Sequence, residues 1–260
     1  MLINTLIALN LMLAPTEISL EDIQHFEQTT SEVTRIYLIR HGESTINQLS
    51  STGIKLTSGK SHAIPLTENG KKQATEVAIK LIGKFPEDGQ YIILSSTALR
   101  AQETADRIFD VLKNHYFIER KESIENLCEL GHGSWEGKPK DKLFDDAAKF
   151  WENLSAKDKF VSPKFTTSES PKDVADRMLS GIKQIIEDNP NKTILLTTHY
   201  FAMNSLVLQL SGHVDDLSEV PSTQLPSLDI GNCDLLLIEL PIGNTIEQAK
   251  IQAHIKSEEK

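Results

Sequence analysis

Short apolar runs alternate along the chain with longer stretches in which apolar residues recur every three or four positions. The runs are rich in β-branched residues, which is typical of buried strands, and the periodic stretches are typical of amphipathic helices. We predict strands at Arg35 to Ile39, Tyr91 to Leu94, Tyr116 to Glu119, Thr193 to Thr198 and Asp234 to Leu240. We predict helices after Thr67, at Ala98 to Leu112, at Pro171 to Glu187 and from His199 to Leu210.

This alternation predicts an α/β fold, a three-layer αβα sandwich on a mainly parallel sheet. We expect a single domain over residues 34–253, because no linker or repeat divides this region. Residues 47–62 are rich in Ser, Thr, Gly and Lys and are predicted to form a loop. Residues 138–170 mix aromatic and charged side chains and are predicted to be a helical insertion over the active site. A charged tail is expected at 254–260.

The first 33 residues differ from the rest. Leu2 to Ala14 is apolar and of the length of a signal-peptide core, but no Lys or Arg precedes it and no clear cleavage site follows. The stretch is too short to span a bilayer readily. We therefore expect a cytoplasmic protein whose N-terminal helix packs on the domain or is partly disordered, with export through a cleaved signal peptide as the alternative. Residues 15–33 are polar and acidic and are predicted to be a lead-in.

The formal net charge of −10 argues against binding to nucleic acid and against stable association with anionic membranes. Cys128 and Cys233 have no metal-ligand spacing and indicate no disulfide framework, so both are predicted to be structural thiols. An anionic ligand would have to be attracted by a local cluster of Arg and His.

Three strand–helix junctions carry such residues. The first predicted strand ends in Arg40-His41-Gly42, the second is followed by Ser95-Ser96 with Arg100 in the next helix, and the strand Thr193 to Thr198 runs directly into His199. The carboxyl ends of parallel strands meet at one edge of a sheet. Arginine forks and a helix N-terminus suit phosphate oxygens, so the sequence predicts a site for a phosphoryl group.

A Gly-rich segment from Leu127 to Gly137 is a predicted loop that can supply an acid. Departure of an alcohol from phosphorus requires a proton, which a carboxyl with a raised pKa can donate. Glu129 is the preferred donor, and Glu125 and Glu136 are the alternatives. His62 and His132 are expected in loops at the mouth of the pocket, and His213 is expected to be an ordinary loop residue.

The chain resembles the histidine phosphatase superfamily in its phosphoglycerate-mutase-like branch. The resemblance covers residues 34 to 240 and rests on several motifs in the family order. They are Arg40-His41-Gly42-Glu43-Ser44 with Asn47, Pro65-Leu66-Thr67-Glu68-x-Gly70-x-x-Gln73-Ala74, Ser95-Ser96-x-x-x-Arg100-Ala101-x-Glu103-Thr104-Ala105, Glu129-x-x-x-Gly133-x-Trp135-Glu136-Gly137, and His199 after its strand.

The resemblance implies a phosphomonoester hydrolase that needs no metal and no cofactor. His41 would form a phosphohistidine, Glu129 would be the proton donor, and the phosphoryl oxygens would be held by Arg40, Asn47, Arg100 and His199. The expected partner is a small phosphomonoester substrate, with a phosphoprotein as a further option. The oligomeric state is left open.

Two other functions are compatible with the same residues. One is a phosphoglycerate-type phosphomutase, although the Glu-Arg-His-Tyr-Gly type of segment typical of those enzymes is absent. The other is a non-catalytic module that binds phospho-ligands. The chain departs from the family in having Tyr200 where a glycine usually follows the second histidine, and this residue could narrow the pocket, stack on a substrate or redirect the loop.

Overall fold

The computed structural model describes residues 15–24, 33–139, 151, 153–165, 167–212, 214, 225 and 227–257. The predicted apolar segment at Leu2 to Ala14 lies outside these residues, as does His213. Among the described residues, no helix combines the length and the apolar character needed to cross a bilayer.

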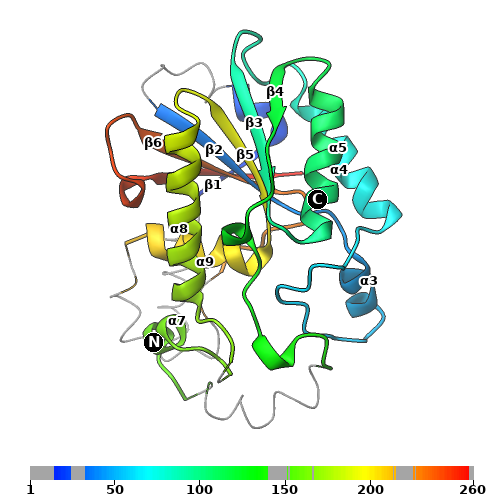
Figure 1. The fold of residues 1–260 in the computed structure, drawn as a ribbon, viewed down its shortest axis with the longest axis vertical. Coiled ribbons are helices and arrows are strands. Elements are labelled where there is room, and N and C mark those ends of the chain that lie inside the picture. The colour runs from blue at the N-terminus through cyan, green and yellow to red at the C-terminus, as the bar shows by residue number, and fades with distance from the viewer. Residues whose placement is uncertain are drawn as a thin grey trace.

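A seven-stranded mixed sheet forms the centre of the molecule (Figure 1), in the order β1-β7-β6-β2-β5-β3-β4. The strands are β1 (Thr16–Ser19), β2 (Val33–Arg40), β3 (Gln90–Ser95), β4 (Phe117–Arg120), β5 (Thr193–Thr198), β6 (Leu235–Pro241) and β7 (Lys250–Lys256). Strands β2, β5, β3 and β4 run parallel, whereas β6 is antiparallel to both of its neighbours. The prediction of a mainly parallel sheet is confirmed.

Helices cover both faces of this sheet (Figure 1). The α-helices are α3 (Thr45–Ser51), α4 (Glu68–Leu81), α5 (Leu99–Leu112), α7 (Ala156–Val161), α8 (Pro171–Asp188) and α9 (Tyr200–Leu210). Short 3₁₀ turns are η1 (Leu20–Asp22), η2 (Glu125–Leu127), η3 (Gly133–Trp135) and η5 (Ile246–Gln248). Thr67 caps α4 as predicted, because its side chain accepts the Gly70 backbone N–H.

The central strand β2 shows why its sequence is a continuous apolar run. Ile36 and Leu38 pack into the core beneath α8 and α9, while Tyr37 and Ile39 pack into the core beneath α4 and α5. Successive side chains of a strand point to opposite faces, so a strand covered on both faces has no polar position in its interior. Burial on both faces holds β2 in place, and β2 in turn positions Arg40 and His41 at its carboxyl end.

Three predicted boundaries were wrong. The lead-in contains β1, which pairs in parallel with β7, and Leu20 and Ile23 beside it are buried. The predicted tail from 254 belongs in part to β7, where His254 and Ile255 are buried. The alternation of apolar residues in β7 is short and flanked by charges, which hides the strand in the sequence. The predicted loop 47–62 begins inside α3.

The predicted helical insertion at 138–170 contains α7, in which Ala156 and Phe160 pack against Ala175 of α8 and Leu208 of α9. Residues 140–150, 152 and 166 of this segment lie outside the described part of the chain. Its placement over the active site therefore stays a prediction.

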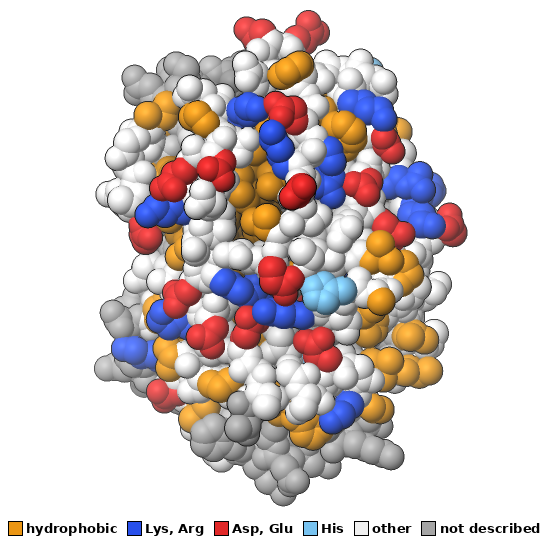
Figure 2. All heavy atoms as spheres, in the orientation of Figure 1, with side chains coloured by type: hydrophobic (Ala, Val, Ile, Leu, Met, Phe, Trp, Pro, Cys, Tyr) orange, Lys and Arg blue, Asp and Glu red, His pale blue; other side chains and the backbone are white. Residues whose placement is uncertain are grey.

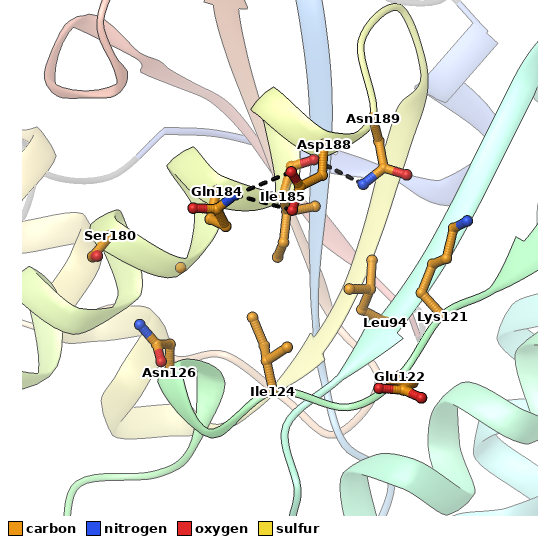
Figure 3. A pocket seen from close by; sticks show the side chains of 11 residues that line it. Leu94, Lys121, Glu122, Ile124, Asn126, Ser180, Gln184, Ile185, Asp188 and Asn189 are labelled. Carbon is orange, nitrogen blue, oxygen red and sulfur yellow. Dashed lines mark hydrogen bonds between the residues drawn. The ribbon is translucent and has the colours of Figure 1, made fainter.

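The face seen in Figure 2 mixes acidic and basic side chains around an apolar hollow. A cavity of about 580 Å³ lies between α8 and residues 121–126 (Figure 3). Leu94, Ile124 and Ile185 give it apolar walls, with Gln184 and Asp188 on the side of α8. None of the predicted catalytic residues lines it.

Candidate active site

The carboxyl ends of β2, β3 and β5 meet, as predicted for parallel neighbours. The His41 backbone N–H donates to Thr198 at 3.0 Å, and that of Ser96 donates to Thr197 at 3.0 Å. A cavity of about 140 Å³ opens beside these ends. Its lining residues are Arg40, His41, Ser44, Ile46, Asn47, Ser50, Leu56, Ser58, Arg100, Glu129, His132, Tyr200 and Phe201. His199 lies next to it, with its ring centroid 5.2 Å from that of His41.

The His41 ring has a defined tautomer. Nδ1 lies 2.7 Å from the Gly42 carbonyl oxygen, which can only accept, so Nδ1 carries the proton and Nε2 keeps its lone pair. Burial lowers the pKa of His41 well below its ordinary value, and the charges of Arg100 and Arg40 lower it further. The imidazole is therefore neutral, with Nε2 available as a nucleophile.

Arg100 lies in the first turn of α5 and is almost fully buried. Its Nη atoms donate to the carbonyl oxygens of Ser61 at 2.9 Å and Gly59 at 3.0 Å, while its Nε donates to His41 Nε2 at 3.3 Å. Two backbone carbonyls of the loop before α4 thus orient a guanidinium toward the nucleophile. Burial lowers the pKa of Arg100, but an arginine remains protonated at any physiological pH.

The second histidine is also neutral and carries a free donor. Burial, followed by the charge of Arg100, lowers the pKa of His199 well below its ordinary value. Its Nε2 lies 2.7 Å from the Ser96 hydroxyl, which also accepts the Ala98 backbone N–H. The hydroxyl can then donate its own proton to Nε2, which places the imidazole proton on Nδ1. This Nδ1 is buried without a hydrogen-bond partner.

Arg40 presents a second unsatisfied donor. Its Nη1 donates to the Ile230 carbonyl at 2.6 Å, but its Nε is buried without a hydrogen-bond partner. A buried donor without a partner costs about 1–3 kcal/mol. The guanidinium stacks on the Tyr200 ring, with its carbon 5.2 Å from the ring centroid. Tyr200 thus lines the cavity from the start of α9, with its ring against Arg40.

Glu129 lies at the N-terminus of α9. Its carboxylate accepts the backbone N–H groups of Leu130 at 2.9 Å, Ala202 at 3.0 Å and Phe201 at 3.2 Å. These bonds and the charge of Arg100 lower its pKa, but burial dominates and raises the pKa above the ordinary carboxyl value. A buried carboxyl with a raised pKa beside the cavity has the properties of a general acid.

Asn47 has a local structural role as well as a place at the cavity. Its Oδ1 accepts the backbone N–H of Ser44 at 3.0 Å and the Ser44 hydroxyl at 2.7 Å, which caps α3. The amide oxygen is thereby occupied, so only the NH₂ group of Asn47 remains to meet a ligand oxygen.

The alternative acids lie elsewhere. The Glu125 side chain is half exposed and accepts the Thr97 hydroxyl at 2.5 Å. Glu136 accepts the backbone N–H of Lys60 at 2.9 Å, and neither glutamate lines the cavity. Of the two loop histidines, His132 lines the cavity and His62 does not.

Some contributors were missed in the sequence. Asn232 donates its amide to the His41 carbonyl at 2.9 Å, and the Thr104 hydroxyl accepts the Gly42 backbone N–H at 3.1 Å. Asn232 belongs to a Gly-Asn turn before β6, a signal of a turn but not of a site. Thr104 was part of a matched motif without an assigned role.

Gly42 and Gly70 are in close contact behind the nucleophile. A Cβ on Gly42 would lie 2.4 Å from the Gly70 carbonyl oxygen, and one on Gly70 would lie 2.0 Å from the Glu43 carbonyl oxygen. Backbone atoms cannot move aside as a flexible side chain can. The loop that carries His41 therefore requires glycine at both positions.

We expect Gly42→Ala to lower the free energy of unfolding by about 1–3 kcal/mol, because the added methyl group overpacks the loop. It should also reduce turnover, since the loop that holds His41 must shift. Gly83→Ala is the matched control: nothing lies within 4 Å of the added Cβ, and only the positive φ of 76° opposes it. Chemical denaturation gives the free energy of unfolding of both variants, and steady-state kinetics give their turnover. Unchanged stability of Gly42→Ala would contradict the close contact.

Comparison with known proteins identifies the family of the chain. Residues 36–244 match the profile of the histidine phosphatase superfamily (branch 1). The uncharacterized phosphatase PhoE of Bacillus subtilis is 26% identical over 203 residues, which cover 78% of this chain and 89% of the relative. The metal-independent phosphoserine phosphatase of Arabidopsis thaliana is 26% identical over 191 residues, which cover 70% of each.

Among solved structures, the phosphoglycerate mutase from Bacillus anthracis has a similar fold. It superimposes with a TM-score of 0.59 at 19% identity, over 85% of this chain and 93% of that chain. An identity this low supports the fold alone. The profile match spans most of the chain, including every strand–helix junction that forms the cavity. The chain therefore belongs to the histidine phosphatase superfamily, branch 1, and has the phosphoglycerate-mutase-like α/β fold.

Proposed function

We propose that this phosphatase hydrolyses phosphomonoesters through a covalent phosphohistidine on His41. The observation that carries the proposal is the state of the His41 ring. Its Nδ1–H is held by the Gly42 carbonyl, and its unprotonated Nε2 faces Arg100 at 3.3 Å. A neutral imidazole held in one tautomer beside a buried cation is suited to attack a phosphoryl group.

In the first step, the Nε2 lone pair attacks phosphorus in line with the ester oxygen. The P–O bond breaks, its electron pair goes to the leaving oxygen, and the Glu129 carboxyl donates the proton that completes the alcohol. The free donors on Arg40 Nε and His199 Nδ1 would bind phosphoryl oxygens. The Nε–H of Arg100 would turn from His41 to a phosphoryl oxygen, and the NH₂ of Asn47 would bind another.

In the second step, water attacks phosphorus and the P–N bond breaks, which returns its electron pair to Nε2. The Glu129 carboxylate takes the proton of the attacking water, and phosphate leaves. Two buried arginines neutralise the charge that builds up on the equatorial oxygens. We propose a metal-independent reaction, because Arg40 and Arg100 already supply this positive charge.

The pH dependence follows from the two pKa shifts. The reaction requires neutral His41, whose pKa is lowered, and protonated Glu129, whose pKa is raised. Activity should therefore fall as the pH drops through the pKa of His41, and fall again as the pH rises through that of Glu129. We expect a bell-shaped profile of kcat/KM, with the acidic limb set by His41 and the basic limb set by Glu129. A profile without a basic limb would contradict the assignment of Glu129 as the acid.

A panel of phosphomonoesters tests the function itself. We expect release of inorganic phosphate from an aryl phosphate and from small-molecule phosphate esters, with phosphopeptides included as the further substrate class. Transfer of phosphate within phosphoglycerate, without release, would instead indicate a mutase. Binding of phosphate esters with no turnover, in protein shown to be folded, would indicate a binding module.

A further inference from the structure

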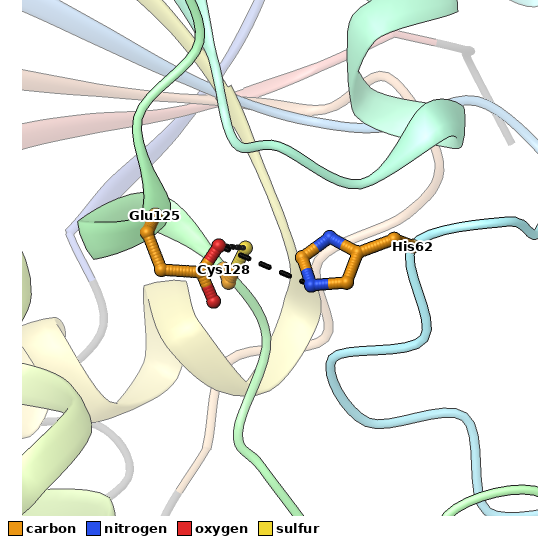
Figure 4. A group of neighbouring side chains, drawn as sticks. All are labelled: His62, Glu125 and Cys128. Carbon is orange, nitrogen blue, oxygen red and sulfur yellow. Dashed lines mark hydrogen bonds and ion pairs between the residues drawn. The ribbon is translucent and has the colours of Figure 1, made fainter.

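Outside the cavity, one cluster of side chains has the composition of a metal site. The imidazole of His62, the carboxylate of Glu125 and the thiol of Cys128 come together so that one ligand atom from each lies within 4.8 Å of the others. Figure 4 shows the imidazole reaching from the loop before α4 toward Glu125 and Cys128, which belong to the segment around η2. In the sequence His62 lies more than 60 positions before Glu125 and Cys128, so the spacing of the three residues gave no metal signal.

The distances fit a tetrahedral zinc ion. At the usual zinc bond lengths, neighbouring ligand atoms lie about 3.3–3.7 Å apart. Cys128 Sγ is 3.5 Å from Glu125 Oε2, and His62 Nε2 is 4.0 Å from the same oxygen. The exposed imidazole would have to move closer to the other two ligand atoms to complete three corners, and water would occupy the fourth.

The surroundings favour an ion that enters from solvent. The side chains of His62 and Glu125 are 56% and 52% exposed, whereas Cys128 is buried at the base of the cluster. The Thr97 hydroxyl lies beside the cluster, 3.2 Å from Cys128 Sγ and 3.3 Å from His62 Nδ1, and it donates to Glu125 at 2.5 Å. A fixed hydroxyl of this kind orients the ligands around it.

We infer that His62, Glu125 and Cys128 form a binding site for Zn²⁺ on the surface next to the active site. A thiolate, an imidazole and one carboxylate select zinc over Mg²⁺ or Ca²⁺, which require several oxygen ligands. Binding would convert the Cys128 thiol to a thiolate and release its proton to solvent. The negative net charge of the chain favours a cation.

A bound ion would link the loop that contains His62 to the segment that contains Glu125 and Cys128, and both segments contact catalytic residues. His62 follows the residues whose carbonyls hold Arg100, and Cys128 directly precedes Glu129. An ion bound to the folded protein alone raises its thermal stability, by about 5 °C or more for a chain of this size when the ion is a hundredfold above its Kd. The ion takes no part in the proposed phosphoryl transfer, so the site does not rest on that proposal.

Cobalt(II) titration of the EDTA-treated full chain tests the inference, because thiolate-bound Co²⁺ has a charge-transfer absorption in the near ultraviolet. We expect one equivalent of Co²⁺ to produce this band, Zn²⁺ to displace it, and Mg²⁺ to leave it unchanged. Cys128→Ser should abolish the band. His62→Ala and Glu125→Gln, at exposed positions where folding is not at risk, should weaken Co²⁺ binding by more than about tenfold.

Three controls locate the ion. His115→Ala removes another exposed histidine, Cys233→Ser removes the other cysteine, and His41→Ala alters the catalytic cavity. We expect all three variants to retain the Co²⁺ charge-transfer band and the rise in Tm with Zn²⁺. The inference is overturned if wild-type protein gives no thiolate band, or if the band persists in Cys128→Ser. Unchanged affinity in both His62→Ala and Glu125→Gln would also overturn it.

Discussion

His41→Ala should lower kcat/KM for every phosphomonoester by about 10⁴-fold or more, because the variant has no atom that can form the covalent intermediate. The remaining cavity keeps both arginines and Glu129, so substrate binding should be affected much less than kcat. Steady-state kinetics with an aryl phosphate measure the loss, and thermal unfolding shows that the variant is folded.

His132→Ala is the matched control, since His132 also lines the cavity but belongs to no proposed chemical step. We expect the kcat/KM of this variant to stay within about tenfold of the wild-type value. A change of this size reflects altered packing around the cavity rather than the loss of a chemical step. Equal losses in the two variants would remove the distinction on which the assignment of His41 depends.

Glu129→Gln should lower kcat/KM by a factor that depends on the leaving group of the substrate. General acid catalysis contributes about 10²–10⁴-fold, and an amide cannot donate the required proton. An alkyl phosphate releases a strongly basic alkoxide and needs the full contribution of the acid. A nitrophenyl phosphate releases a stable phenolate, so its kcat/KM should fall far less. The ratio of the two losses measures proton donation directly.

Glu125→Gln and Glu136→Gln serve as controls for this experiment. Both carboxylates bind backbone or hydroxyl groups outside the cavity, so neither variant should show a dependence on the leaving group. If one of them does, and Glu129→Gln does not, then the acid has been assigned to the wrong residue.

Much of the site could be predicted because its residues follow directly after buried strands. In β2 the apolar run Ile36 to Ile39 ends directly before Arg40, and in β5 the buried residues continue through Thr198 to His199. A parallel sheet brings such ends together regardless of the loops between them. The positions of Arg100 and Glu129 could be predicted for a related reason, since one begins a helix and the other lies in a loop rich in glycine.

The rest depends on contacts between residues that are far apart in the sequence. The Asn232 amide holds the His41 carbonyl across 191 positions, and the Ser96 hydroxyl contacts His199 Nε2 across 103. Neither residue differs in sequence from an ordinary turn or cap residue. The edge strand β1 and its neighbour β7 were missed because four to seven residues with charged neighbours give a weak periodic signal.

The role of Tyr200 also required the structure. The sequence indicated only a departure from the usual glycine. The structure shows that α9 begins at this residue and that its ring stacks on the Arg40 guanidinium. The side chain lines the cavity and packs against Arg40, the proposed phosphate ligand, while the second histidine keeps its place at the end of β5.

The central claim is that the phosphoryl group passes through His41 Nε2. Rapid acid-free quenching during turnover, followed by peptide mass spectrometry, tests it directly. We expect an alkali-stable, acid-labile phosphate on the peptide that contains His41, formed at a rate at least equal to kcat and absent from His41→Ala. A phosphate found on another residue, or turnover without any phosphoenzyme in this test, would contradict the account.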